Sequence, residues 1–136
     1  MAPVPLEGYN NPHMAQRILI IEDNPDFRDL LTYTLNAAGY TLLTAATGKE
    51  GLDTARREQP DLILTDLMLP LMNGYEICSM LKQDVRYRSI PILMLSATKV
   101  QEKDEHLAKD CGADMFVLKS IEPKELLVKV RELLSR

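Results

Sequence analysis

The chain has 136 residues, 46% of them apolar, which is enough material for one domain with a buried core. Its 20 acidic and 16 basic residues give a formal charge of -4, and without a long basic run this argues against direct binding to nucleic acid or to an anionic membrane. The longest apolar runs are only about four to six residues, far below the ~20 needed to span a bilayer, so no transmembrane segment is expected.

Residues 1–16 differ in composition from the rest of the chain. They are rich in Pro, Gly and Asn, show no periodicity and carry a single charge at Glu7. We expect a disordered tail, in which His13-Met14 fits a cloning remnant placed before a native start at Met14. The basic start and apolar stretch of a signal peptide are absent, and a cytoplasmic domain spanning residues 17–136 is expected.

Short apolar runs then alternate with helical patterns five times, which is typical of βα units that form a parallel sheet. The first run, residues 17–21, is apolar at successive positions, as in a strand covered by helices on both faces. Asn24 and Pro25 supply an N-cap and a first-turn proline, and Gly39 ends the helix that follows. Apolar and small side chains recur in it at helical spacing: Phe27, Leu30, Leu31, Thr34 and Ala38.

The middle of the chain repeats this alternation. Residues 40–45 predict the second strand, and Thr47 with Glu50 indicates a capping box at the start of a helix that ends before Pro60. Residues 61–65 predict the third strand. A loop with Pro70 and Asn73-Gly74 leads to a helix with Ile77, Met80 and Leu81 on one face, and Pro91 begins the fourth strand.

The last third is more polar. Residues 101–109 predict a charged surface helix with a narrow buried stripe, Gly112 ends it, and residues 115–118 form the last strand. Glu122 and Pro123 open a final helix whose apolar residues are Leu126, Leu127, Val130, Leu133 and Leu134. Cys78 and Cys111 have no metal-ligand spacing, so we expect small buried thiols. The whole pattern predicts an α/β fold, (βα)5, with a five-stranded parallel sheet between two helical layers.

Polar residues stand where the predicted strands end. Glu22-Asp23, Asp66, Ser96 and Lys119 each close an apolar run, and the carboxyl ends of parallel strands form the edge where open α/β sheets bind ligands. Carboxylates suit Mg²⁺, which takes hard oxygen ligands. Taken singly, these residues could be a solvated acidic loop, a turn former, a turn hydroxyl and a solvated strand tip. Gathered at one edge, they predict a site for a divalent cation and a phosphoryl group.

Each residue has a role in such a site. The carboxylate of Asp66 is the candidate nucleophile, which would form an aspartyl phosphate. Lys119 would supply positive charge to the phosphoryl oxygens, and Ser96 would donate its hydroxyl to one of them.

The ordered set of motifs resembles the receiver domain of two-component response regulators, a CheY-like domain with the flavodoxin-like doubly wound fold. The resemblance covers roughly residues 16–136. Its matching pieces are Ile18-Leu19-Ile20-Ile21-Glu22-Asp23-Asn24, the run from Asp61 to Pro70 with Asn73-Gly74, Pro91-Ile92-Leu93-Met94-Leu95-Ser96-Ala97, and the run from Gly112 to Lys119.

The resemblance implies a phosphorelay switch. Asp66 would accept a phosphoryl group from the phosphohistidine of a histidine kinase or phosphotransfer protein, and the domain would catalyse its own phosphorylation and dephosphorylation without being an enzyme. Mg²⁺ would be held by Glu22, Asp23, Asp66 and the backbone carbonyl of Met68. Ser96 and Phe116 would move with the phosphoryl group and change the surface of the last helices and strand, which a downstream effector reads. Taken alone, Phe116 would more often be plain core.

Two positions depart from the family pattern. Ser120 follows Lys119 where most receivers have a proline after a cis peptide, which leaves the aim of the lysine open, since a cis bond before serine costs about 3–4 kcal/mol. Glu22 stands where aspartate is common, and we expect metal binding to survive this change. Met68 and Thr98 flank the path of attacking water and neither is a good base, which predicts a long-lived aspartyl phosphate.

Two other functions compete with the switch. A pseudo-receiver that is never phosphorylated would use the same fold as a binding module, and Ser120 keeps this reading open. A phosphohydrolase of the haloacid-dehalogenase type would share the aspartate nucleophile, but it usually needs a second aspartate where this chain has Met68. The sequence leaves open the cognate kinase, the output target and a homodimer through the last helix.

Overall fold

The structure is a computed structural model that describes residues 15–98, 106 and 109–136. Its five strands all run parallel in one sheet in the order β2-β1-β3-β4-β5. The strand bounds are Arg17–Ile21 (β1), Thr41–Ala45 (β2), Leu62–Asp66 (β3), Ile92–Ser96 (β4) and Met115–Leu118 (β5). The chain runs from β1 outward to β2 on one side and to β3 on the other, so the strand order reverses between β1 and β3. The predicted doubly wound α/β fold is confirmed.

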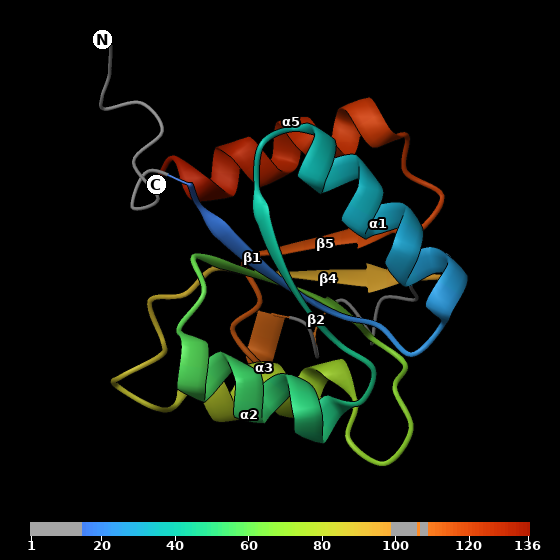
Figure 1. The fold of residues 1–136 in the computed structure, drawn as a ribbon. Coiled ribbons are helices and arrows are strands. Elements are labelled where there is room, and N and C mark those ends of the chain that lie inside the picture. Colours follow the sequence, from blue (N-terminus) through green and yellow to red (C-terminus); the bar gives the residue numbers. More distant parts are fainter. Residues whose placement is uncertain (1–14, 99–105, 107–108) are drawn as a thin grey trace, which may run out of the picture.

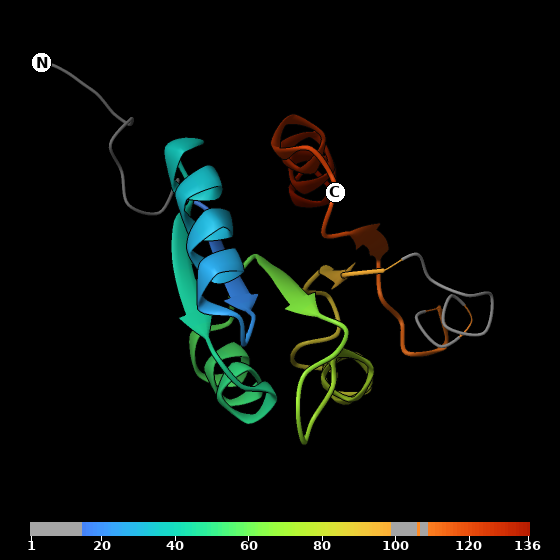
Figure 2. The ribbon, with the colours of Figure 1, turned by 90° about the vertical axis from the view of Figure 1, so that its right-hand side faces the viewer.

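Helices cover both faces of this sheet (Figure 1). Their bounds are Pro25–Ala37 (α1), Gly48–Glu58 (α2), Gly74–Lys82 (α3) and Pro123–Leu134 (α5). Helices α1 and α5 lie on one face and α2 and α3 on the other, and the view in Figure 2 separates the two helical layers. Within the described residues no helix is both long and apolar enough to cross a membrane.

Two predicted segments lie largely outside the described residues. Of the expected helix at 101–109, only His106 and Lys109 are described, and both are helical. The expected tail at 1–16 is described only at Ala15 and Gln16.

The sheet separates two apolar cores. On β1, Leu19 and Ile21 pack with the core under α2 and α3, whereas Ile18 and Ile20 pack with the core under α1 and α5. Both sets are fully buried, because successive side chains of a strand point to opposite faces. This two-sided burial explains why the strands are apolar at every position, and it holds the strand ends in fixed positions.

Two helices bury different residues from those expected. Leu30 of α1 is 52% exposed and Leu35 is buried in its place. Met80 of α3, which was expected on the buried face, is 41% exposed, whereas Cys78 on the same helix is fully buried, as expected for a small thiol. Leu30 and Met80 are apolar and lie next to the buried residues of their helices, so the prediction placed them on the buried face. Hydrophobicity alone does not show which of two neighbouring apolar residues points into the core.

The helix starts also differ from the prediction in one detail. Thr47 Oγ1 accepts from the backbone N–H of Glu50, as in a capping box, but the Glu50 carboxylate accepts from Ala46 rather than from Thr47. The full capping box stands instead at α3, where Asn73 and Glu76 bond each other's backbone N–H groups at 3.0 and 3.1 Å. The Asn73-Gly74 pair is therefore a helix start as well as a loop end.

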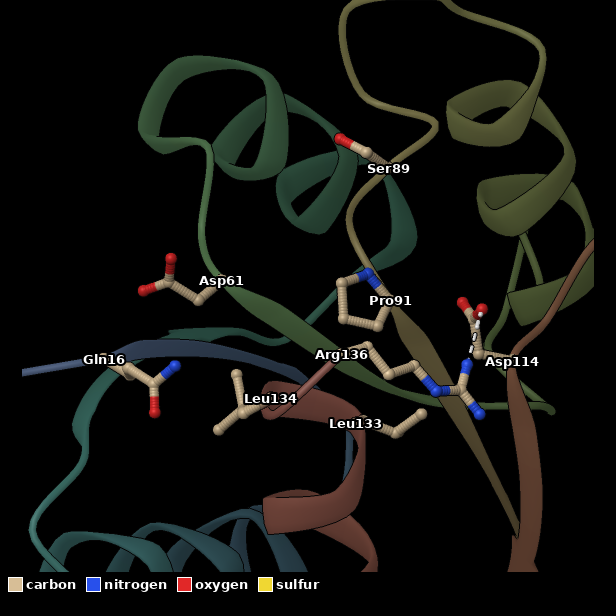
Figure 3. Close-up of a pocket in the computed structure, with 8 residues that line it drawn as sticks. All are labelled: Gln16, Asp61, Ser89, Pro91, Asp114, Leu133, Leu134 and Arg136. Atoms are coloured by element: carbon tan, nitrogen blue, oxygen red, sulfur yellow. Dashed lines mark hydrogen bonds and ion pairs between the residues drawn. The ribbon is translucent and has the colours of Figure 1, made fainter.

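At the amino ends of the strands, a lysine ties several elements together. Lys82 Nζ, at the end of α3, donates to the carbonyl oxygens of Arg88 and Ile90 and pairs with Asp114 at 2.9 Å. Asp114 also pairs with Arg136, and this contact borders a hollow of about 280 Å³ (Figure 3). The residues lining it are Gln16, Asp61, Ser89, Pro91, Asp114, Leu133, Leu134 and Arg136.

Candidate functional site

The candidate site lies at the opposite edge, where the parallel strands end. In the sheet register Ile21 of β1 pairs with Thr65 of β3, so the next residues, Glu22 and Asp66, emerge at the same level. Asp66 pairs in turn with Leu95 of β4, which sets Ser96 one residue further on. The register alone therefore gathers the predicted polar residues from three strands.

The three predicted carboxylates come together as a cluster. One oxygen each from Glu22, Asp23 and Asp66 can be chosen so that all lie within 4.8 Å of one another. Glu22 is only 1% exposed and Asp66 5% exposed, whereas Asp23 is exposed. Three negative charges at this spacing repel one another, and two of them are shielded from water, so the cluster favours a cation.

Lys119 reaches into this cluster from the end of β5. Its Nζ lies 2.6 Å from Glu22 Oε1 and 3.2 Å from Asp66 Oδ2, and 4.7 Å from the centre of the Phe27 ring. Its backbone N–H donates to the carbonyl of Ser96 at 2.7 Å. None of the described residues follows a cis peptide bond, so the Lys119–Ser120 bond is trans. The lysine aims at the acidic cluster without the cis-proline turn of the family pattern.

Burial and neighbouring charges shift the pKa values of both Glu22 and Lys119. Burial raises the pKa of Glu22 above its usual value, an effect that the Lys119 ammonium and the backbone N–H of Asn24 only partly offset. Burial also works against the charge of Lys119, but the Glu22 and Asp66 carboxylates outweigh it and raise the pKa of the lysine. The ammonium is therefore charged at neutral pH and holds the two carboxylates at close range.

The cluster fits a divalent metal ion on its own chemistry. Within the described part of the chain, Glu22 Oε1 is a buried oxygen that accepts no hydrogen bond of normal geometry, although Lys119 lies beside it as an ion pair. Buried polar atoms of this kind usually have a partner. Three carboxylates and one ammonium leave two negative charges uncompensated. Hard oxygen ligands and this charge suit a small divalent cation.

The backbone behind Asp66 is held closely. The N–H of Met68 donates to Asp66 Oδ1 at 3.2 Å, and the N–H of Gly74 donates to Leu67 at 3.0 Å. A Cβ on Gly74 would lie 2.6 Å from the carbonyl oxygen of Asp66, which is too close for any other residue without a shift of the backbone. The start of α3 therefore packs directly against the residue that carries the site.

The side chains of Ser96 and Phe116 contact other parts of the structure rather than the acidic cluster. Ser96 is buried, and its hydroxyl donates to the carbonyl of Thr98 at 2.9 Å. Phe116 is half-buried and packs with the core under α2 and α3. The structure thus brings Glu22, Asp23, Asp66 and Lys119 into one cluster, with Ser96 on the neighbouring strand. The metal-binding role predicted for the Met68 carbonyl stays a prediction.

Sequence reasoning missed some residues that shape the site. Phe27 was assigned only to the helix core, yet its ring lies against the Lys119 ammonium. Asn24 caps α1 and also donates its backbone N–H to Glu22 Oε2 at 3.0 Å, while Arg28 donates to the Glu22 carbonyl at 2.8 Å. An apolar residue in the first turn after an acidic pair was the available signal for Phe27, and it fits an ordinary helix equally well.

Comparison with known proteins gives a consistent result. The sequence model of the response regulator receiver domain matches residues 18–131. The DNA-binding response regulator MtrA of Mycolicibacterium smegmatis is 41% identical over 123 residues, which cover 90% of this chain and 52% of that protein. The chain spans about half the length of the curated relatives it matches.

Solved structures agree in fold. The receiver domain of a signal transduction histidine kinase from Syntrophus aciditrophicus superposes with a TM-score of 0.83 at 34% identity, covering 89% of this chain and 91% of that one. The receiver domain of a sensor histidine kinase from Pseudomonas aeruginosa PAO1, at 27% identity and a TM-score of 0.82, covers 90% and 99% of the two chains. That structure has a magnesium ion coordinated in its active-site cleft.

Proposed function

Because this chain belongs to the family of response regulator receiver domains, we propose that it is a phosphoacceptor switch in which Asp66 carries the phosphoryl group. The observation that supports this role most directly is the contact of the buried Asp66 carboxylate with Lys119 at 3.2 Å, inside a cluster that includes Glu22 and Asp23.

The proposed donor is the phosphohistidine of a histidine kinase or a phosphotransfer protein. An oxygen of Asp66 attacks phosphorus, the bond from phosphorus to the imidazole nitrogen breaks, and the imidazole takes up a proton as it leaves. Lys119 already lies between Glu22 and Asp66, so its charge can balance the phosphoryl oxygens with little movement. A Mg²⁺ ion held by Glu22, Asp23, Asp66 and the Met68 carbonyl would neutralise further negative charge at phosphorus.

The same geometry supports a conformational output. The Ser96 hydroxyl bonds Thr98 in this structure, and a phosphoryl group on Asp66 would offer it a charged acceptor. We infer that Ser96 turns toward that acceptor and that Phe116 repacks behind it. The phosphoryl group would shift the equilibrium between the present arrangement of Ser96 and Phe116 and the turned one only by as much as it stabilises the turned one more.

A small phosphodonor tests the phosphoacceptor role without knowledge of the kinase. The purified chain is incubated with acetyl phosphate and Mg²⁺, and its intact mass is measured over time. We expect a single adduct of about 80 Da, the mass of one phosphoryl group. The adduct should be absent from Asp66→Asn and unchanged in Asp53→Asn, because Asp53 is an exposed residue of α2 that pairs with Lys49 on the same helix.

The time course also tests self-catalysis. An adduct that appears without any kinase, and that decays faster in the folded chain than in the denatured chain once the donor is removed, would show that the domain catalyses both of its own reactions. A folded chain that gains no mass would instead favour the non-phosphorylated binding module. An adduct that persists in Asp66→Asn would rule out Asp66 as the acceptor. Turnover of the donor to free phosphate at an enzyme's rate would favour the phosphohydrolase.

The partners follow from this role as proposals. The relative MtrA is named as DNA-binding, but the matched region covers only about half of it, and the absence of direct nucleic-acid contact stays a prediction for this chain. The expected partners are a histidine kinase or phosphotransfer protein and a downstream effector or protein target that reads the surface of the last helices and strand. The cytoplasmic location and a homodimer through α5 also stay predictions.

A further inference from the structure

Two thiols that lie 33 residues apart in the sequence meet beneath the sheet. Cys78 is on α3, and its Sγ lies 3.3 Å from the carbonyl oxygen of Cys111. The Cys78 thiol therefore lies directly against the backbone of Cys111. Neither is part of a disulfide in this structure. Sequence spacing gave no reason to pair them.

The two sulfurs differ in their access to solvent. Cys78 is fully buried within the core under α2 and α3. Cys111 is also buried but lines an outward hollow of about 430 Å³ together with Tyr75, Ser79 and Met80. A small molecule in that hollow therefore contacts Cys111, whereas Cys78 is buried in the core.

The two thiols also differ in acidity. The contact with Cys78 lowers the pKa of Cys111 to about 7, although burial opposes this. The same contact, together with burial, raises the pKa of Cys78. The thiolate, which is the reactive form, is therefore favoured at Cys111 relative to an ordinary cysteine, while Cys78 keeps its proton.

We propose that Cys111 and Cys78 form an oxidation site, in which Cys111 is the attacking thiol and Cys78 the resolving thiol of an intramolecular disulfide. The arrangement supports it because Cys111 borders a hollow open to solvent and the Cys78 thiol lies 3.3 Å from the Cys111 carbonyl oxygen, so that each cysteine has a second one beside it, as in reversible thiol oxidation. The site lies outside the phosphoacceptor cluster and does not depend on the proposed function.

The chemistry balances with a peroxide as the oxidant. The Cys111 thiolate attacks one peroxide oxygen, the O–O bond breaks, and the hydroxide released takes a proton to become water, which leaves a sulfenic acid. The Cys78 sulfur then attacks the Cys111 sulfur, the S–O bond breaks, and the departing hydroxide takes the Cys78 proton as a second water. Two thiols lose two electrons in total, and one hydrogen peroxide gains them.

The lining of the hollow favours a small neutral oxidant. Glu76 and Asp110 also border it, and their negative charge disfavours anionic oxidants such as glutathione disulfide. A bulky disulfide would in addition have to reach a residue that is only 8% exposed. Hydrogen peroxide meets neither obstacle, so it is the proposed class of reactant.

Titration of the whole chain with hydrogen peroxide tests this site. Intact mass should fall by about 2 Da as two hydrogens leave, and a reductant should restore it. Maleimide added after denaturation should label two thiols before oxidation and none after it. The rate of oxidation should rise as the pH increases through about 7, following the Cys111 thiolate.

Single variants separate the two roles. Cys78→Ser should stop at a sulfenic acid on Cys111, which a dimedone adduct would detect, whereas Cys111→Ser should react at least about tenfold more slowly because the remaining thiol is protonated and buried. Circular dichroism checks that both variants fold. Disulfide-linked dimers, loss of a single thiol, or equal rates for the two variants would overturn the proposal, as would a wild-type chain that keeps both thiols.

Discussion

The ammonium of Lys119 is held by two carboxylates and the face of one aromatic ring. Glu22 and Asp66 supply the charge, and the Phe27 ring lies 4.7 Å away on the first turn of α1. A cation over a ring gains about 0.5–1 kcal/mol at exposed sites and ~2 or more when water is excluded. Phe27 therefore restricts the lysine from the side that the carboxylates leave open, and we regard it as a positioning residue.

Replacing the Phe27 ring by an aliphatic side chain should slow phosphorylation without abolishing it. Phe27→Leu keeps the apolar contact but removes the ring face, so the rate of adduct formation with acetyl phosphate should fall by roughly 2- to 5-fold, the equivalent of about 0.5–1 kcal/mol. Phe27→Tyr keeps the ring and serves as the matched control. Equal rates for the leucine variant and the native chain would contradict this role.

The lifetime of the aspartyl phosphate depends on the residues that flank it. Met68 is 73% exposed and has no group that could orient water, and Thr98 is likewise exposed. We expect Met68→Asn to shorten the lifetime by about tenfold, equivalent to ~1.4 kcal/mol of barrier, because an amide can hydrogen-bond the attacking water. Decay of the phosphorylated mass after donor removal measures this, with Met68→Leu as the control. A longer lifetime in the asparagine variant would refute it.

At the scale of elements, the start of α3 supports the site through close backbone contact. Gly74 follows the capping residue Asn73, and its missing side chain allows the helix to approach the carbonyl of Asp66. The same approach would be blocked by a single methyl group. The position of the phosphoacceptor along the sheet edge thus depends on a glycine eight residues further along the chain.

Gly74→Ala should therefore weaken both the fold and the site. The added methyl would have to move the helix or the end of β3, at a cost of roughly 1–3 kcal/mol, as for other overpacked positions. Urea unfolding measures the stability, and Ser79→Ala on the same helix, expected to change it by less than about 0.5 kcal/mol, is the control. An unfolding free energy equal to that of the native chain would show that the contact relaxes at no cost.

The element pattern was predictable because two-sided burial leaves a strong signal. The unbroken run from Ile18 to Ile21 fixed β1, and with it the level at which Glu22 emerges. Helix faces were less certain, as Leu30 and Met80 show, because neighbouring apolar residues compete for one narrow stripe. The contacts of Phe27 with Lys119 and of Cys78 with Cys111 were out of reach, since they depend on the packing of elements that are distant in sequence.

At the scale of the whole molecule, the acidic cluster costs stability until a cation binds. The exposed Asp23 lies close to the buried carboxylates of Glu22 and Asp66, which both contact Lys119. Ligands that bind the native state stabilise it by mass action, by about 2.7 kcal/mol at a concentration 100-fold above Kd. The chain should consequently respond to Mg²⁺ in its melting temperature.

Removing the charge of Asp23 should make the order of the two melting temperatures, variant and native, depend on Mg²⁺. Without Mg²⁺, Asp23→Asn should melt at the same temperature as the native chain or slightly above it, because repulsion is relieved. With millimolar Mg²⁺ it should melt below the native chain, which gains a few degrees while the variant gains little. Thermal melts at matched ionic strength measure both. An equal rise in the two proteins would mean that the cation binds elsewhere.

Lys82 and Asp114 fasten the beginnings of β4 and β5, whereas the far ends of these strands carry Ser96 and Lys119. Each strand is therefore held at its beginning, while its other end lies at the phosphoacceptor edge. Four to five residues span about 15 Å, so a tilt of only about 5° at the held end displaces the tip by roughly 1 Å. A small tilt of either strand would thus displace its tip, next to Ser96 or Lys119, further than its fastened beginning.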